Sequence, residues 1–121
     1  MTKKILTVDD SATMRNMLRS TLAAAGYEVI QAEDGVQGIK ALDGQKFDLI
    51  ITDINMPNMD GLTFIEQLRD KPEHKSTPVL VLTTENEPEK KSRARRAGAT
   101  GWLVKPFDPQ KLVATINRVS P

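Results

Sequence analysis

The chain has 121 residues, of which 39% are hydrophobic and 27% are charged, and this composition suits one globular domain with a buried core. Its 17 basic and 16 acidic residues leave a net charge of +1, which gives no reason to expect nucleic acid or an anionic membrane as a partner. The absence of cysteine excludes disulfides and thiolate metal ligands.

No segment is typical of export or of a membrane span, so we expect a cytoplasmic protein. The N-terminal stretch MTKKILTVDD contains an apolar run of only four residues, which is too short for a signal peptide. Later apolar runs are far below the roughly 20 residues of a transmembrane helix. We also expect the protein to be a monomer.

Five short apolar runs predict five β-strands. They are Ile5–Val8, Tyr27–Ala32, Leu49–Thr52, Val79–Thr83 and Trp102–Val104. Three of these runs, ILTV, LIIT and VLVLT, are almost continuous and rich in β-branched residues. This composition is typical of strands that are buried on both faces of a parallel sheet.

Segments of helical periodicity lie between the strands. The first helix carries an apolar stripe from Met14 to Ala25, in which Met14 and Met17 are expected to lie in the core, and Gly26 is placed to end it. The later helices begin at residues that commonly precede a helix, which are Asp34, Asp60, Glu87 and Asp108.

The alternation of strand and helix predicts an α/β fold. The connections are short, and we find no linker, repeat or low-complexity segment, so residues 1–121 are expected to form one domain. Such a chain forms a parallel five-stranded sheet with helices on both faces, joined by right-handed crossovers. We therefore expect a three-layer sandwich.

Charged and polar side chains stand at the carboxyl ends of four predicted strands. Asp9 and Asp10 follow the first strand, Asp53 follows the third, Thr83 ends the fourth, and Lys105 follows the fifth. Ligands of an open parallel sheet bind outside the carboxyl ends of its strands, so we expect these side chains to meet in one crevice. Each residue alone has a plainer explanation as a cap, a turn or a strand residue, but their coincidence at one edge favours a site.

The residue types at this edge predict a phosphoryl site with a magnesium ion. Three carboxylates held together repel one another unless they share a cation, and aspartate oxygens suit Mg²⁺. Lys105 adds a positive charge and Thr83 adds a hydroxyl group, so the site can stabilise a phosphoryl group. Asp53 is the expected nucleophile, since an aspartate can carry a covalent phosphoryl group.

Four motifs, VDD, DINMPNMDG, LTT and KPF, resemble the receiver domain of two-component response regulators. The resemblance covers essentially the whole chain, in the order and spacing of the family. Single-domain chemotaxis regulators of the CheY type are the most similar, because AEDG, NMPNMDG and GATGWLVKPF also match. The resemblance implies a flavodoxin-like (βα)5 fold with strand order 2-1-3-4-5.

The resemblance also implies a role for each site residue. Asp53 would be the phosphoacceptor. Asp10 and Asp53 would bind Mg²⁺ through their side chains and Asn55 through its backbone carbonyl, while Asp9 would act mainly through water. Lys105 would contact the phosphoryl oxygens.

The same resemblance implies a switch and two tuning positions. Thr83 would turn inward to bind the phosphoryl oxygens, and this turn would be coupled to Trp102, where the chemotaxis regulators carry tyrosine. An indole is larger than a phenol, so we expect Trp102 to favour an outward position in the unphosphorylated protein. Asn55 and Glu85 occupy positions that tune dephosphorylation, and the Lys105–Pro106 bond is expected to be cis.

The implied function is that of a phosphorylation switch in a two-component system. A histidine kinase would transfer a phosphoryl group to Asp53 with Mg²⁺, and the protein would then bind a protein target, such as a flagellar motor switch component in chemotaxis. A phosphatase is a further expected partner. We expect that the protein is not an enzyme and that it catalyses only its own phosphoryl uptake and autodephosphorylation. A phosphorelay intermediate or a phosphate sink is the alternative role.

Two other functions fit the fold class but not the motifs. A phosphatase of the haloacid dehalogenase type needs Asp-x-Asp after its first strand, whereas Asp9 and Asp10 are adjacent. A flavodoxin-like cofactor carrier needs a phosphate loop rich in glycine and hydroxyl groups, where DDSATM would place two negative charges.

The segment EPEKKSRARR is rich in cations, but its arrangement favours a solvated helix face. Its glutamates precede its cations, as the helix dipole favours, and Glu87–Lys91 and Glu89–Arg93 are predicted i,i+4 pairs. A docking surface for an acidic partner is the alternative.

Overall fold

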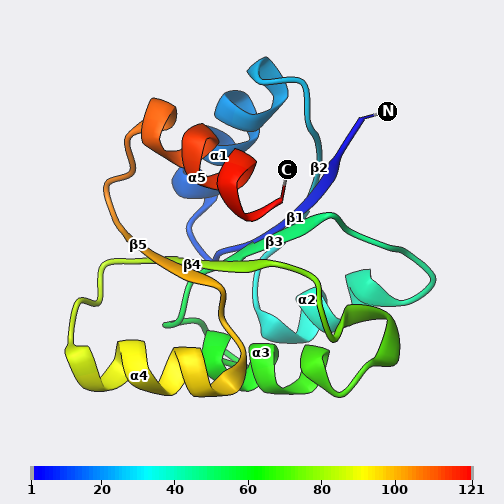
Figure 1. The fold of residues 1–121 in the computed structure, drawn as a ribbon, viewed down its shortest axis with the longest axis vertical. Coiled ribbons are helices and arrows are strands. Elements are labelled where there is room, and N and C mark those ends of the chain that lie inside the picture. The colour runs from blue at the N-terminus through cyan, green and yellow to red at the C-terminus, as the bar shows by residue number, and fades with distance from the viewer. Residues whose placement is uncertain (1, 121) are drawn as a thin grey trace.

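The structure is a computed structural model that describes residues 2–120. A sheet of five parallel strands forms its centre, with helices on both faces (Figure 1). The strands are β1 (Lys4–Val8), β2 (Glu28–Ala32), β3 (Leu49–Thr52), β4 (Val79–Thr83) and β5 (Gly101–Val104). The helices are α1 (Ala12–Ala24), α2 (Gly35–Leu42), α3 (Gly61–Arg69), α4 (Pro88–Ala97), α5 (Pro109–Val119) and a short 3-10 helix, η1 (Pro72–His74).

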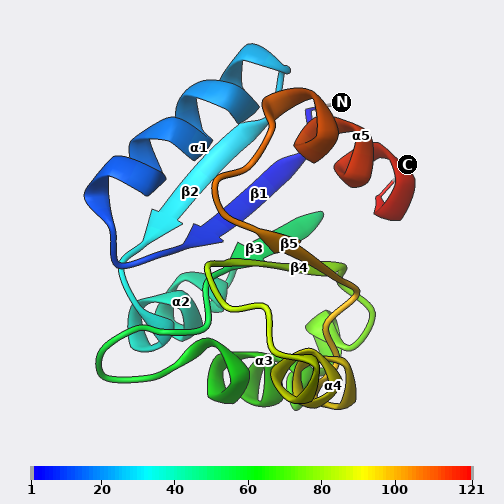
Figure 2. The same cartoon turned by 90° about the vertical axis from the view of Figure 1, so that its left-hand side faces the viewer.

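The strand order is β2-β1-β3-β4-β5, which confirms the predicted fold class and topology. Helices α1 and α5 cover one face of the sheet, and α2, α3 and α4 cover the other (Figure 2). The register pairs Val8 of β1 with Thr52 of β3, so the next residues, Asp9 and Asp53, leave the sheet side by side. On the far side, Thr83 pairs with Val104, which brings Lys105 beside the end of β4.

Each face of the sheet has its own hydrophobic core. Leu18 and Leu22 of α1 pack with Leu112 and Ile116 of α5 on one face, and a cluster that includes Phe64 of α3 fills the other. Every residue of β3 and β4 is buried, as their continuous apolar sequences predicted. Strands β3 and β4 are therefore a rigid base for the residues at their carboxyl ends.

Helix caps follow the predicted chemistry, because aspartates fold back onto free backbone N–H groups. Asp34, Asp60 and Asp108 each accept a hydrogen bond in the first turn of the helix that follows. Gly98 adopts a φ of 119° at the end of α4, which only glycine reaches without strain. Glu87 precedes α4 but makes no side-chain cap.

One core prediction is wrong. The side chain of Met17 is 45% exposed, whereas Met14 packs against the core beneath α1 and α5. Leu18 and Leu22 form the buried stripe of α1, and Met17 lies about 100° around the helix from Leu18.

In residues 2–120 no helix combines the length and the apolar character needed to cross a bilayer.

We predict that Gly61→Ala destabilises the fold by roughly 1–3 kcal/mol, because overpacking a closed turn displaces its neighbours. A Cβ atom at this position would contact the Asp53 carbonyl oxygen and lie 2.8 Å from Cα of Ile54. Urea unfolding measures the loss. Gly44→Ala is the control, since its Cβ meets nothing within 4 Å and only a φ of 72° opposes it. An equal loss in both variants would contradict the close-contact explanation.

Candidate functional site

The predicted carboxylates meet at one edge of the sheet. Oxygen atoms of Asp9, Asp10 and Asp53 all lie within 4.8 Å of one another. Asp9 and Asp53 are buried, with 2% and 7% of their surfaces exposed, while Asp10 is exposed. The Asp9 N–H donates to Ala32 and the Asp53 N–H to Val8, so the sheet's own hydrogen bonds hold both residues in place.

Lys105 closes the cluster from the edge strand. Its Nζ lies 2.8 Å from Oδ2 of Asp9 and 2.8 Å from Oδ2 of Asp53. Burial by itself lowers the pKa of Lys105, but the hydrogen bonds to Asp53 and Asp9, with their charges, outweigh burial and leave the pKa above its usual value. Lys105 therefore carries a positive charge at neutral pH. The Lys105–Pro106 bond is cis, as expected.

Backbone donors fix the orientation of the two buried carboxylates. Oδ1 of Asp53 accepts from the N–H of Ile54 at 2.6 Å. Oδ1 of Asp9 accepts from the N–H of Ser11 at 2.9 Å, and the Ser11 hydroxyl caps α1. Each of these oxygens keeps a further lone pair, because a carboxylate offers about four acceptor directions. The carboxylates can thus accept another ligand without losing their present donors.

The chemistry of this donor set fits a hard divalent cation. Three carboxylates and one ammonium leave two net negative charges in a small volume. Oxygen ligands and this charge suit Mg²⁺, which binds through a few carboxylates and keeps water in its other positions. Asp9, Asp10 and Asp53 would hold the ion.

Glu85 links this site to β5 and α4. Its Oε1 accepts from Nδ2 of Asn55 at 3.0 Å and pairs with Nζ of Lys90 at 3.0 Å. Hydrogen bonds from Asn55, and then from Lys90, lower the pKa of Glu85. The backbone oxygen of Glu85 accepts from the indole N–H of Trp102 at 3.2 Å. Asn55 and Glu85, for which the family resemblance implies a tuning role, are therefore in direct contact.

Thr83 and Trp102, the expected switch residues, both contact Glu85. The Thr83 side chain is fully buried, and its Oγ1 accepts from the N–H of Glu85 at 3.3 Å. Trp102 is half-buried and packs against the core beneath α2, α3 and α4. The expected outward preference of Trp102 stays a prediction, because a half-buried indole is compatible with either position. The Glu85 carbonyl satisfies the indole N–H, which removes the main objection to burying it.

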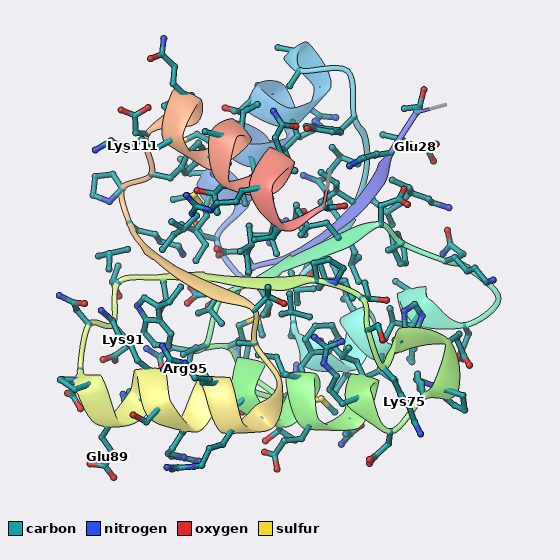
Figure 3. All side chains as sticks on the ribbon, in the orientation of Figure 1. Glu28, Lys75, Glu89, Lys91, Arg95 and Lys111 are labelled. Carbon is teal, nitrogen blue, oxygen red and sulfur yellow. The ribbon has the colours of Figure 1, made fainter. Side chains whose placement is uncertain are left out.

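Helix α4 confirms a solvated face but not the predicted ion pairs. Ala94 is its one buried residue. Figure 3 shows Lys91 and Arg95 on the side of α4 that faces β5, with Glu89 pointing away. Within residues 2–120 the only ion pair from α4 is Lys90–Glu85, so neither Glu87–Lys91 nor Glu89–Arg93 forms.

The sequence reasoning missed Arg15 as a site residue. Its Nη1 donates to the Asp9 carbonyl at 2.7 Å, and its Nη2 lies 3.7 Å from Glu33. The AEDG motif was a signal for this contact, because it places Glu33 directly after the strand beside β1.

Comparisons with known proteins agree with this geometry. The family model of the response regulator receiver domain matches residues 5–117. Chemotaxis protein CheY1 of Helicobacter pylori is 41% identical over 111 residues, which are 90% of each chain. The structure of chemotaxis protein CheY4 of Vibrio cholerae has a TM-score of 0.95 and 48% identity, covering 98% of this chain and 99% of the other.

A third similar protein is described with a metal ion. It is the receiver domain of a sensor histidine kinase from Pseudomonas aeruginosa, whose structure holds magnesium coordinated in the active site cleft. Its TM-score is 0.90 at 25% identity, with 98% of this chain and 97% of that chain covered.

We predict that Asp10→Asn weakens Mg²⁺ binding and stabilises the metal-free protein by up to about 1 kcal/mol, because it relieves repulsion within the cluster. Calorimetric titration measures the affinity and urea unfolding measures the stability. Asp70→Asn, which changes an exposed aspartate at the end of α3, is the control. Mg²⁺ affinity unchanged by Asp10→Asn would show that Asp10 is not a ligand.

Proposed function

Because this chain belongs to the response regulator receiver domain family, we propose that it is a signalling switch that accepts a phosphoryl group on Asp53. The observation that carries the proposal is the position of Lys105, whose Nζ lies 2.8 Å from the Asp53 carboxylate. A fixed ammonium beside a buried nucleophile can neutralise the oxygens of an arriving phosphoryl group.

The proposed reaction is transfer of the group from a phosphohistidine of a histidine kinase. One carboxylate oxygen of Asp53 attacks phosphorus, so a P–O bond forms while the P–N bond to histidine breaks. The electron pair of that bond stays on the imidazole nitrogen. Lys105 holds the phosphoryl oxygens, and the Ile54 N–H keeps the other Asp53 oxygen in place. Mg²⁺, when bound by the aspartates and the Asn55 carbonyl, would neutralise negative charge on the group.

In the loss of the phosphoryl group, the oxygen of water attacks phosphorus and the P–O bond to Asp53 breaks, while the protons of the water leave with the phosphate or pass to solvent. The product is inorganic phosphate and a free Asp53 carboxylate. Asn55 lies two residues after Asp53 and contacts Glu85, which supports the proposed role of both residues in tuning this rate. The protein would catalyse these two reactions of its own carboxylate only.

The phosphoryl group would be sensed through Thr83. Its hydroxyl would turn to a phosphoryl oxygen and give up the hydrogen bond from Glu85. Since the Glu85 carbonyl holds the indole of Trp102, a shift of Glu85 would alter the surface between α4 and β5. A crevice of about 70 Å³ lies there, lined by Trp102 with Lys91 and Arg95 among others, and its cations suit an acidic segment of a target.

Chemotaxis is the proposed setting, and a component of the flagellar motor switch is the proposed target. The support is that CheY1 and CheY4, at 41% and 48% identity over 90% or more of each chain, are both described as chemotaxis proteins.

We predict that Asp53→Asn abolishes phosphoryl uptake from acetyl phosphate with Mg²⁺, because an amide cannot act as the nucleophile. Intact-mass measurement should show one phosphoryl group on the wild type and none on this variant. Asp70→Asn should take up the group as the wild type does. Equal uptake by Asp53→Asn would rule out Asp53 as the acceptor.

We predict that beryllofluoride and Mg²⁺ together change the emission of Trp102, the only tryptophan of the chain. The change arises because Thr83 and Trp102 both contact Glu85. Thr83→Ala should reduce the change without preventing phosphorylation. The coupling is refuted by an unchanged wild-type spectrum in a sample that fluorine NMR shows to be fully loaded.

A further inference from the structure

The loop between β2 and α2 supplies none of the expected ligands, but it contacts the loop that follows β3. Asp34 in this loop is buried, with 6% of its surface exposed. Its Oδ1 accepts from the N–H of Gln37 at 2.9 Å, which is an ordinary helix cap. Its Oδ2 accepts from Nδ2 of Asn58 at 2.7 Å, a contact between residues 24 positions apart that a cap does not require.

Asn58 lies in the loop between β3 and α3, and its backbone is unusual. Its φ is 66°, and within residues 2–120 no other residue except glycine has a positive φ. This conformation is sparsely populated for a residue with a Cβ, although asparagine tolerates it better than most. A second contact lies beside the first, because the Gly35 N–H donates to the Met59 carbonyl at 3.2 Å. The start of α2 thus binds the loop at two consecutive residues.

The bound loop is the one that carries Asn55. At its beginning, the Ile54 N–H is tied to Asp53, and at its end the Gly61 N–H donates to the Ile54 carbonyl at 2.8 Å. Between these points two side-chain hydrogen bonds join the loop to other segments, one from Asn55 to Glu85 and one from Asn58 to Asp34. The backbone around Asn55 therefore depends on a residue outside the metal cluster.

We propose that Asp34 is a positioning residue for the cation site, which acts through Asn58 to hold the Asn55 carbonyl in place. The inference rests on the proposed function, since it concerns the same Mg²⁺ site. Asp34 touches neither the cation ligands nor the phosphoryl group. Asp34 instead keeps the loop ordered before the cation binds. A loop that is already ordered loses less conformational freedom on binding, so the affinity for the cation is higher.

The state of Asp34 supports this role. The hydrogen bonds from the Gln37 backbone, and then from Asn58, lower the pKa of Asp34. Asp34 is therefore a carboxylate at neutral pH, and its bond to the Asn58 amide has a charged acceptor. Such bonds are shorter and stronger than neutral ones, consistent with the 2.7 Å separation.

Asn58→Gly tests the proposal because glycine keeps the positive φ and removes the amide. Calorimetric titration should show Mg²⁺ affinity lower by about three- to tenfold, the range expected for one lost charge-assisted hydrogen bond that holds a loop. Asp34→Ser should give a similar loss, since serine still caps α2 but is too short to reach Asn58. Asp108→Ser, which changes the cap of α5 in the same way, should leave the affinity unchanged.

The double variant separates positioning from general stability. If both residues act through one contact, Asp34→Ser with Asn58→Gly should lose no more affinity than either single variant. Urea unfolding of all four variants shows whether a loss of affinity merely follows a loss of stability. Wild-type affinity in Asn58→Gly would overturn the proposal, and so would additive losses, or a wild type that binds no Mg²⁺. Failure of the wild type to take up a phosphoryl group from acetyl phosphate would instead refute the proposed function.

Discussion

The ammonium of Lys105 lies between the carboxylates of Asp9 and Asp53, and this contact balances the charge that the fold concentrates at one edge of its sheet. Parallel strands in the order β2-β1-β3-β4-β5 bring the ends of β1 and β3 together, so repulsion between their aspartates is built into the topology. One lysine offsets only part of that charge. The remaining negative charge suits a divalent cation, and the ammonium is already in place for an anionic group.

Glu85 connects the site to the surface residues of α4 and β5. Its side chain contacts Asn55 and Lys90, its N–H contacts Thr83, and its carbonyl contacts Trp102. A change at Asp53 that moves Thr83 would therefore disturb Glu85, whose carbonyl also holds the indole of Trp102. These contacts are short and local, so the proposed signal needs no rearrangement of the buried strands β3 and β4.

The fold and the charged residues of the site could be predicted because their signals are local. Continuous apolar runs mark β3 and β4, aspartates mark the helix starts, and a parallel sheet brings strand ends together. The contact from Trp102 to Glu85 could not be predicted, because the acceptor is a backbone carbonyl whose position depends on how the loop after β4 folds. The Asp34–Asn58 bond joins two loops and has no periodicity to reveal it. Met17 was misplaced because one position along a helix separates a buried face from an exposed one.

A crystal structure of the protein with Mg²⁺ and beryllofluoride tests the central claim most directly. We expect beryllium on a carboxylate oxygen of Asp53, one fluorine within hydrogen-bonding distance of Lys105 Nζ, and another within that distance of Thr83 Oγ1. Beryllofluoride bound to Asp9 or Asp10 instead would contradict the claim. So would a lysine that still bridges Asp9 and Asp53 without contacting fluorine.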